Sequence, residues 1–247
     1  MIKQLKGGLP LLATLLKESN YTVVFTGAGM STESGLPDFR SSTGLWKQVD
    51  PTRLASIDAL ENNREEFIRF YHKRMQAIHK YKPHRGHEIL GEWEQQGLIH
   101  AIITQNVDGF HQQAGSKNVT ELHGSLRTVH CHTCGKTYPN SEFIAGRFDC
   151  DCGGFLRPSV VLFGEMLPFD AVQKAEEETA KAELFIVLGS SLSVYPANSF
   201  PVEAKQNGAK LVIVNFEPTD YEDLADLVIH ERKIGEVLQE IDESIAR

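Results

Sequence analysis

One stretch near the start of the chain limits its fold more than any other. An apolar β-type run, Tyr21–Phe25, is followed at once by Thr26-Gly27-Ala28-Gly29. Two glycines one residue apart let the backbone turn tightly and approach a ligand closely. Small and hydroxylated residues follow, as at a helix start whose free N–H groups hold a pyrophosphate. This pattern predicts a nucleotide site at the end of a first strand; the alternative is a glycine-rich turn that binds nothing.

Two features argue against an ordinary dehydrogenase. The dinucleotide fingerprint needs glycine at its last position, where this chain has Thr32. No second strand ending in a ribose-reading acid follows about 20 residues on. Pro37-Asp38-Phe39-Arg40 and a polar segment follow instead, and we expect a mobile lid over residues 38–50. A nicotinamide oxidoreductase that uses the same glycine turn stays open as an alternative.

The rest of the chain alternates between helical patterns and apolar strands. Helices are expected over residues 9–18, 65–80, 84–96, 171–181 and 197–206 and from Ile234 on, and strands over 21–26, 99–104, 119–122, 160–163, 184–188, 210–214 and 227–229. Continuous apolar strands between helices indicate a parallel sheet covered on both faces. We therefore expect an α/β, Rossmann-like parallel-sheet domain. Polar clusters follow its strands, at the strand ends where such sheets bind ligands.

The four cysteines lie in two pairs, Cys131-x-x-Cys134 and Cys150-x-Cys152. In a chain without a secretory signal this spacing favours a metal site over disulfides. Four thiolates suit tetrahedral zinc and leave no open position for water, so the Zn2+ would be structural. The alternative is four unrelated thiols. A zinc ribbon that binds a partner without catalysis is also open, although few basic and aromatic residues surround the cysteines.

The bulk composition agrees with a globular domain. The chain has 247 residues, 41% of them hydrophobic, and a formal net charge of −8. This acidic balance disfavours nonspecific nucleic-acid binding. No apolar run reaches the length of a membrane span, and residues 1–6 carry no signal peptide. We expect a cytoplasmic protein with no nucleic-acid or membrane partner.

Several motifs together resemble those of the sirtuins, the NAD-dependent protein-lysine deacylases. They are GAGMSTESGLPDFR at 27–40, TQNVD at 104–108, His123-Gly124, the four cysteines, VLFGE at 161–165, GSSL at 189–192 and NFE at 215–217. The resemblance covers residues 20–235. Ser190 departs mildly from it, because many members carry threonine there.

The resemblance implies a reaction that consumes NAD+ rather than reducing it. The amide oxygen of an acyl-lysine attacks the nicotinamide ribose, nicotinamide leaves, and the acyl group ends on ADP-ribose. His123 would act as the general base, a role that fits a group titrating near neutral pH. Asn106 and Asp108 would complete the catalytic set, with Asp108 holding the nicotinamide carboxamide. From the residues alone, His123 is also open to a structural role, and Asn106 and Asp108 to capping a helix that starts near residue 107.

The remaining roles follow from the same resemblance. The expected NAD-binding residues are Gly27, Ala28, Gly29, Ser31, Glu33, Asp38, Phe39, Arg40, Gln105, Asn106, Val107, Asp108, Gly189, Ser190, Ser191, Asn215, Phe216, Glu217 and Ile234. The expected substrate-binding residues are Tyr71, Arg74, Val161, Phe163, Gly164, Glu165 and Val194. The expected partner is an acylated lysine of a protein or peptide, which would add as a strand between residues 161–165 and residues 193–195.

Tyr71 and Arg74 lie three apart on an expected helix and so share a face. In one branch of the sirtuins a Tyr-x-x-Arg pair at this place reads the carboxylate of succinyl- or malonyl-lysine, and a guanidinium suits a carboxylate. The alternative is that Tyr71 extends the apolar face and Arg74 is solvated. We expect deacylase activity, with deacetylation the safer expectation.

The motif positions divide the chain into two parts. Residues 1–40, 86–124 and 160–247 are expected to form the NAD-binding domain. A helical insert at 41–85 and the zinc module at 125–159 are expected to form a small domain, with the active site in the cleft between the two.

Overall fold

The computed structural model describes residues 8–41, 44–47 and 50–246. Its larger sheet has six strands in the order β3-β2-β1-β7-β8-β9, and all neighbouring strands are parallel. These strands are β1 (Thr22–Thr26), β2 (Ala101–Thr104), β3 (Val119–Glu121), β7 (Leu184–Leu188), β8 (Lys210–Val214) and β9 (Leu227–Ile229). The expected Rossmann-like parallel sheet is therefore confirmed.

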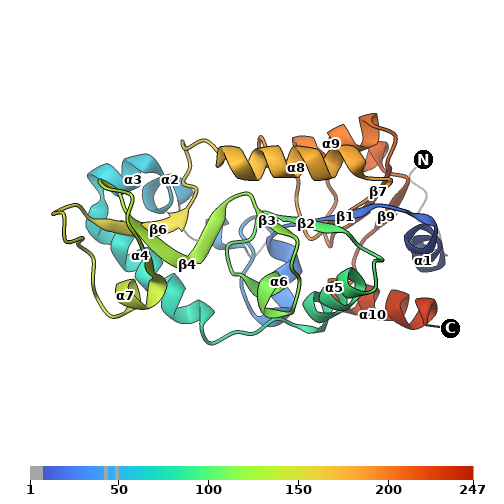
Figure 1. The fold of residues 1–247 in the computed structure, drawn as a ribbon, viewed down its shortest axis with the longest axis horizontal. Helices are drawn as coiled ribbons and strands as arrows, with labels where there is room; N and C mark the ends of the chain where they lie inside the picture. Colours follow the sequence, from blue (N-terminus) through green and yellow to red (C-terminus); the bar gives the residue numbers. More distant parts are fainter. Residues whose placement is uncertain (1–7, 42–43, 48–49, 247) are drawn as a thin grey trace.

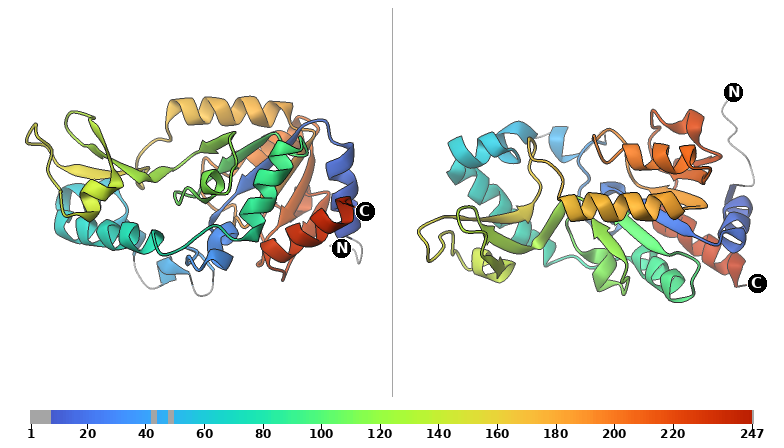
Figure 2. Two further views of the ribbon diagram at one scale, coloured as in Figure 1. Left: turned by 60° about the horizontal axis from the view of Figure 1, so that its bottom comes forward. Right: turned by 45° about the horizontal axis from the view of Figure 1, so that its top comes forward.

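Helices cover both faces of this sheet, and its strands are buried accordingly (Figures 1 and 2). Along β1, Val24 belongs to the core under α1 (Gly8–Glu18), α5 (Arg85–Gln95) and α10 (Ile234–Ile245). Val23 and Phe25 belong to the opposite core, under α8 (Phe169–Lys181) and α9 (Ser199–Gln206). Because successive side chains of a strand point to opposite faces, a strand covered on both sides is apolar on both, as Val23, Val24 and Phe25 are here.

The order in which the chain adds strands to the sheet reverses at β1. Strands β2 and β3 lie on one side of β1, and β7, β8 and β9 lie on the other. Gly27, after β1, donates its N–H to the carbonyl oxygen of Leu188 over 3.1 Å, and Gly29 donates to Gly189 over 2.8 Å. A Cβ on Gly27 would lie 2.7 Å from the oxygen of Gly189, so only glycine fits there. Ligands of open parallel sheets bind in the crevice beyond the strand ends at such a reversal point.

A second unit lies at one end of the elongated molecule (Figure 1). Its antiparallel sheet has the order β5-β4-β6, with β4 (Gly124–Cys131), β5 (Thr137–Pro139) and β6 (Leu156–Val160). Beside it are α2 (Pro51–Leu54), α3 (Ile57–Asn62), α4 (Arg64–Ile78) and α7 (Asn140–Ile144). A third core, which includes Phe67, Met75, Leu126 and Phe143, joins these helices to the sheet.

Two local expectations were wrong. Residues 160–163 do not form a strand of the large sheet: β6 pairs with β4 and ends at Val160, and Phe163 then donates its N–H to the Ala55 carbonyl. The helix expected to start near residue 107 begins later: the short α6 (Phe110–Gln113) starts after Gly109, a residue with a φ of +76°. An apolar run of four residues does not reveal which sheet it joins, and the left-handed backbone at Gly109 delays the helix.

The glycine segment continues as a 3-10 helix, Ala28–Ser34, and two more 3-10 turns occur at Leu45–Lys47 and Glu222–Leu224. Residues 42–43 and 48–49 of the expected lid, and the N-terminal residues 1–6, lie outside the described part. Among the described residues, no helix combines the length and apolar character needed to cross a membrane.

Candidate functional site

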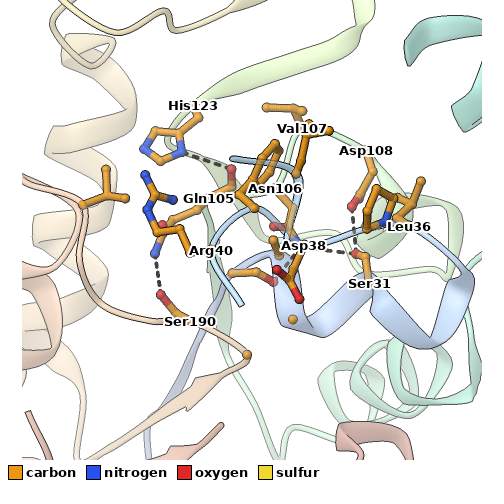
Figure 3. A pocket seen from close by; sticks show the side chains of 18 of the residues that line it. Ser31, Leu36, Asp38, Arg40, Gln105, Asn106, Val107, Asp108, His123 and Ser190 are labelled. Atoms are coloured by element: carbon orange, nitrogen blue, oxygen red, sulfur yellow. Dashed lines mark hydrogen bonds between the residues drawn. The ribbon is translucent and has the colours of Figure 1, made fainter. Parts of the chain in front are cut away.

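A cavity of about 800 Å3 opens at the reversal point, at the carboxyl ends of β1 and β7. Its volume lies within the usual range for small-ligand sites. Every residue that the sequence assigned to catalysis, NAD binding or acyl-lysine binding lines this cavity. The residues labelled in Figure 3 come from the glycine segment and its continuation to Arg40, the loop after β2, His123 and the loop after β7.

His123 lies between β3 and β4, where the large sheet gives way to the small one. Its Nδ1 lies 3.1 Å from the backbone carbonyl oxygen of Gln105 (Figure 3). Since a carbonyl oxygen only accepts, Nδ1 carries the hydrogen, and the neutral ring has its lone pair on Nε2. Burial lowers the pKa of His123, the hydrogen bond to Gln105 opposes that shift, and Arg40 adds to it. The ring is therefore held in its neutral form and can accept a proton at Nε2.

Asp108 is a buried carboxylate with two hydrogen bonds. Its Oδ2 accepts from the Ser31 hydroxyl over 2.8 Å, and its Oδ1 accepts from the N–H of Phe110 over 2.9 Å. The second bond caps α6, as the alternative reading of this residue expected. Burial raises the pKa of Asp108, although both hydrogen bonds and the charge of Arg74 act the other way. Asp108 therefore caps a helix and lines the cavity at the same time.

Asn106 and Gln105 are held by the glycine segment and the loop after β7. The Asn106 amide donates to the carbonyl oxygen of Gly27 over 2.9 Å. The Gln105 amide donates to the Ser190 hydroxyl over 2.9 Å. The loops after three adjacent strands, β2, β1 and β7, are thus cross-linked, and polar side chains from them face one cavity.

Two expected cofactor residues also make structural contacts at the far end of the cavity. Glu33 accepts a hydrogen bond from the N–H of Gly235, in the first turn of α10, over 2.7 Å. Asn215 donates to the Glu217 carbonyl over 2.7 Å and so closes the loop after β8. A carboxylate at a helix N-terminus interacts favourably with the helix dipole, so Glu33 fixes α10 beside the glycine segment.

Tyr71 and Arg74 both lie on the cavity face of α4. Tyr71 is 4% exposed, and burial raises its pKa to about 12. The Arg74 guanidinium lies over the ring of Phe39 at 5.0 Å and over that of Phe70 at 5.5 Å. Burial lowers the pKa of Arg74. The helix therefore turns both residues toward the cavity, and Arg74 is not directed into solvent.

The segment 161–165 forms one rim of the cavity. Val161 donates its N–H to the His123 carbonyl over 2.9 Å, and Ile57 donates to the Phe163 carbonyl over 3.1 Å. Glu165 turns inward to Arg157 of β6. Burial alone would raise the pKa of Glu165, but Arg157 and the Leu162 N–H outweigh it and lower that pKa. The side chain of Phe163 is 41% exposed.

The four cysteine sulfurs lie within 4.8 Å of one another. The Cys131–Cys152 and Cys134–Cys150 pairs are 3.5 and 3.7 Å apart. Sulfurs at about 2.3 Å from a tetrahedral zinc ion stand about 3.8 Å apart, so the donor set fits zinc. The Tyr138 hydroxyl lies 3.2 Å from the Cys150 sulfur, and two N–H groups approach the Cys131 sulfur at 3.4 Å. Such donors suit thiolates.

The sequence missed part of the α4 wall. Phe70, Ala77, Ile78 and Tyr81 line the cavity beside Tyr71 and Arg74. Phe70, Ala77 and Ile78 lie three or four positions from Arg74, and Tyr81, just after α4, lies three positions from Ile78. The helical period is therefore the signal that finds them once one of them is placed. Arg232 and Lys233, just before α10, also line the cavity, and they belong to none of the motifs found in the sequence.

Comparison with known proteins identifies the family. The model of the Sir2 family matches residues 27–196. The chain belongs to the Sir2 family. A protein of Oceanobacillus iheyensis named NAD-dependent protein deacetylase is 63% identical, over 92% of this chain and 96% of that protein. NAD-dependent protein deacetylase 1 of Geobacillus kaustophilus is 58% identical, over 95% of this chain and 98% of that protein.

Solved Sir2 structures superpose closely on this fold. A complex described as Sir2, a p53 peptide and NAD+ has a TM-score of 0.86 at 39% identity, covering 96% of this chain and 98% of the other. Another Sir2 enzyme has a TM-score of 0.91 at 42% identity, covering 98% and 99%. The sirtuin resemblance inferred from the motifs is therefore confirmed.

Proposed function

We propose that this Sir2-family chain is an NAD-dependent protein-lysine deacetylase. The observation that carries the proposal is the pairing of His123, oriented by Gln105, with the buried Asp108–Ser31 pair in one cavity. The relatives named as NAD-dependent protein deacetylases support the same reaction. NAD+, an acyl-lysine and one water molecule are consumed, and the products are nicotinamide, lysine and O-acyl-ADP-ribose.

Each side chain would have a defined task in this reaction. His123 takes a proton from a ribose hydroxyl at Nε2 and returns it later, while its Nδ1 stays bound to Gln105. Asp108 holds the nicotinamide carboxamide, and Asn106 and Gln105 position the ribose. Ser31 bonds the side chains of both Asp108 and Asn106. Ser190, Ser191 and Arg40 meet the phosphates, and Asn215 and Glu217 the adenosine ribose. Phe39 shields the reactive sugar from water.

We also propose that Tyr71 and Arg74 admit acyl groups with a terminal carboxylate. Support comes from their place on the cavity wall and from the burial of Tyr71. A guanidinium stacked on Phe39 and Phe70 presents its N–H groups at its edges, where a carboxylate accepts two of them. Succinyl- and malonyl-lysine would then be substrates beside acetyl-lysine.

The proposal includes one structural Zn2+ held by Cys131, Cys134, Cys150 and Cys152, with no step of the reaction at the metal. We further propose residues 41–85 and 125–159 as the small domain, supported by the third core that joins them. The cytoplasmic location stays a prediction.

Product analysis tests the proposed reaction. Incubation with NAD+ and an acetyl-lysine peptide should give O-acetyl-ADP-ribose and deacetylated peptide in equal amounts by mass spectrometry. An oxidoreductase would instead produce the absorbance of the reduced cofactor and no free nicotinamide. A non-catalytic zinc-ribbon protein would leave both NAD+ and peptide intact. Either of the last two results would contradict the proposal.

A further inference from the structure

A buried arginine lies directly behind the segment 161–165, outside the residues assigned to the reaction. Arg157 is in β6, and its side chain is 4% exposed. A buried charge is costly unless it is paired and hydrogen-bonded. Its partner is Glu165, the last residue of the segment, whose side chain is 25% exposed.

Arg157 and Glu165 form a two-pronged ion pair. The Nη1 atom bonds Oε1, and Nη2 bonds Oε2 over 2.9 Å. Arg157 Nη2 also donates to the carbonyl oxygen of Val160 over 2.8 Å. Glu165 Oε2 accepts in addition from the N–H of Leu162 over 2.7 Å. The pair thus ties the last residue of the segment to β6 and, through Leu162, to the start of the segment.

The carboxylate of Glu165 is directed inward by these contacts. Two guanidinium N–H groups and one backbone N–H occupy its oxygens. The rest of the segment is fixed by Val161 to the His123 carbonyl and by Phe163 to Ala55. With these contacts made, the side chains of the rim and the backbone around Gly164 remain directed toward the cavity.

We propose that Arg157 is a positioning residue for the acyl-lysine peptide and that it acts through Glu165 without touching the substrate. The ion pair holds the segment 161–165 in the conformation that receives an extended peptide. Glu165 is then an anchor of the rim, and it does not read the charge of the peptide. This inference rests on the proposed deacetylase function and on that segment as the peptide-binding rim.

Steady-state kinetics of Arg157→Gln, Arg157→Lys and Glu165→Gln test the inference. The KM for an acetyl-lysine peptide should rise about 10-fold or more in Arg157→Gln and Glu165→Gln, because a misplaced rim loses binding geometry. Arg157→Lys keeps the charge without the fork and should fall in between. The KM for NAD+ should stay within about 3-fold of wild type, since the NAD-binding loops are not tied to this pair.

The matched control is Glu92→Gln. Arg85 and Glu92 form the same two-pronged pair on α5, with contacts of 2.6 and 2.9 Å, and neither lines the cavity. This variant should leave the peptide KM unchanged. KM does not depend on the fraction of enzyme that is folded, so partial misfolding of a variant lowers the rate without imitating the expected result.

A pair of peptides separates anchoring from direct contact. One carries lysine and arginine beside the acetyl-lysine, and the other carries alanine there. Anchoring requires Glu165→Gln to raise the KM of both peptides by the same factor. An unchanged peptide KM, or a rise confined to the basic peptide, overturns the inference while the deacetylase proposal stands. A wild-type protein with no peptide-dependent release of nicotinamide overturns both.

Discussion

The Nδ1 atom of His123 donates to the backbone carbonyl oxygen of Gln105, 3.1 Å away, on the loop that also carries Asn106 and Asp108. This bond places the basic lone pair on Nε2 and links the base to the loop proposed to hold the nicotinamide end. The position of the base therefore depends on the backbone after β2.

The first prediction concerns the pH dependence of catalysis. The pKa of His123 lies below its ordinary value, and the base works in its neutral form. The acid limb of kcat/KM should therefore fall below pH 6.5, the ordinary pKa of histidine. Arg40→Gln removes a positive charge that lowers this pKa, so the limb should move to higher pH. Arg85→Gln, on α5, is the control and should leave it in place. If the acid limb stays at the same pH in Arg40→Gln, it does not report the protonation of His123.

The second prediction concerns acyl selectivity. A charge-assisted hydrogen bond contributes about 1.5–3 kcal/mol, so Arg74→Ala should lower kcat/KM for a succinyl-lysine peptide about 10- to 100-fold. Deacetylation should change less than about 3-fold, because an acetyl group offers no carboxylate to the guanidinium. The control is Arg69→Ala, an exposed arginine on the same helix that pairs with Glu65. Equal losses for both acyl groups would show that Arg74 supports the cavity wall and does not select the substrate.

The third prediction concerns the metal. Purified protein should contain one zinc ion per chain, and a strong chelator should remove it together with the structure of residues 125–159. Circular dichroism and a zinc assay on the same samples measure both. A reducing agent alone should change nothing, since four thiolates hold the metal. Loss of structure on reduction without zinc would indicate disulfides instead.

The fourth prediction concerns stability in acid. His111 is 1% exposed, and burial lowers its pKa to about 3. Below pH 6.5 the unfolded chain binds a proton on this ring that the folded chain does not. Protonation of His111 in the unfolded chain should therefore lower the free energy of unfolding by about 1.4 kcal/mol per pH unit, from pH 6.5 down to about pH 3. In His111→Asn, urea unfolding at pH 6.5, 6.0 and 5.0 should show a shallower slope, by about half a proton at pH 6.5 and by nearly one proton at pH 5.0. An unchanged slope would refute the assignment.

Much of the fold was predictable because a parallel sheet buries its strands on both faces. Runs such as Val23-Val24-Phe25 and Leu184–Leu188 are apolar for that reason, and the polar residues that follow them meet at one edge. The short run at Val160 was placed in the wrong sheet, because its pairing with β4 depends on contacts with residues about 30 positions away.

The sequence predicted which residues meet at the site. It did not predict the contacts that they make with one another. The motifs placed Glu165 and Arg74 at one cavity. They did not reveal that Glu165 turns inward to Arg157 or that Arg74 stacks on Phe39. Both contacts join segments distant in sequence, and each depends on rotamers that tertiary packing selects.

The central claim is that His123 acts on a sugar whose bond to nicotinamide is broken only when an acyl-lysine is present. The most direct measurement is nicotinamide release with and without an acetyl-lysine peptide, in wild type and in His123→Ala. Wild type should release nicotinamide only with peptide, and His123→Ala should lose about 100- to 10,000-fold in peptide deacetylation while its thermal unfolding is unchanged. Release that ignores the peptide, or full deacetylation by His123→Ala, would contradict the account.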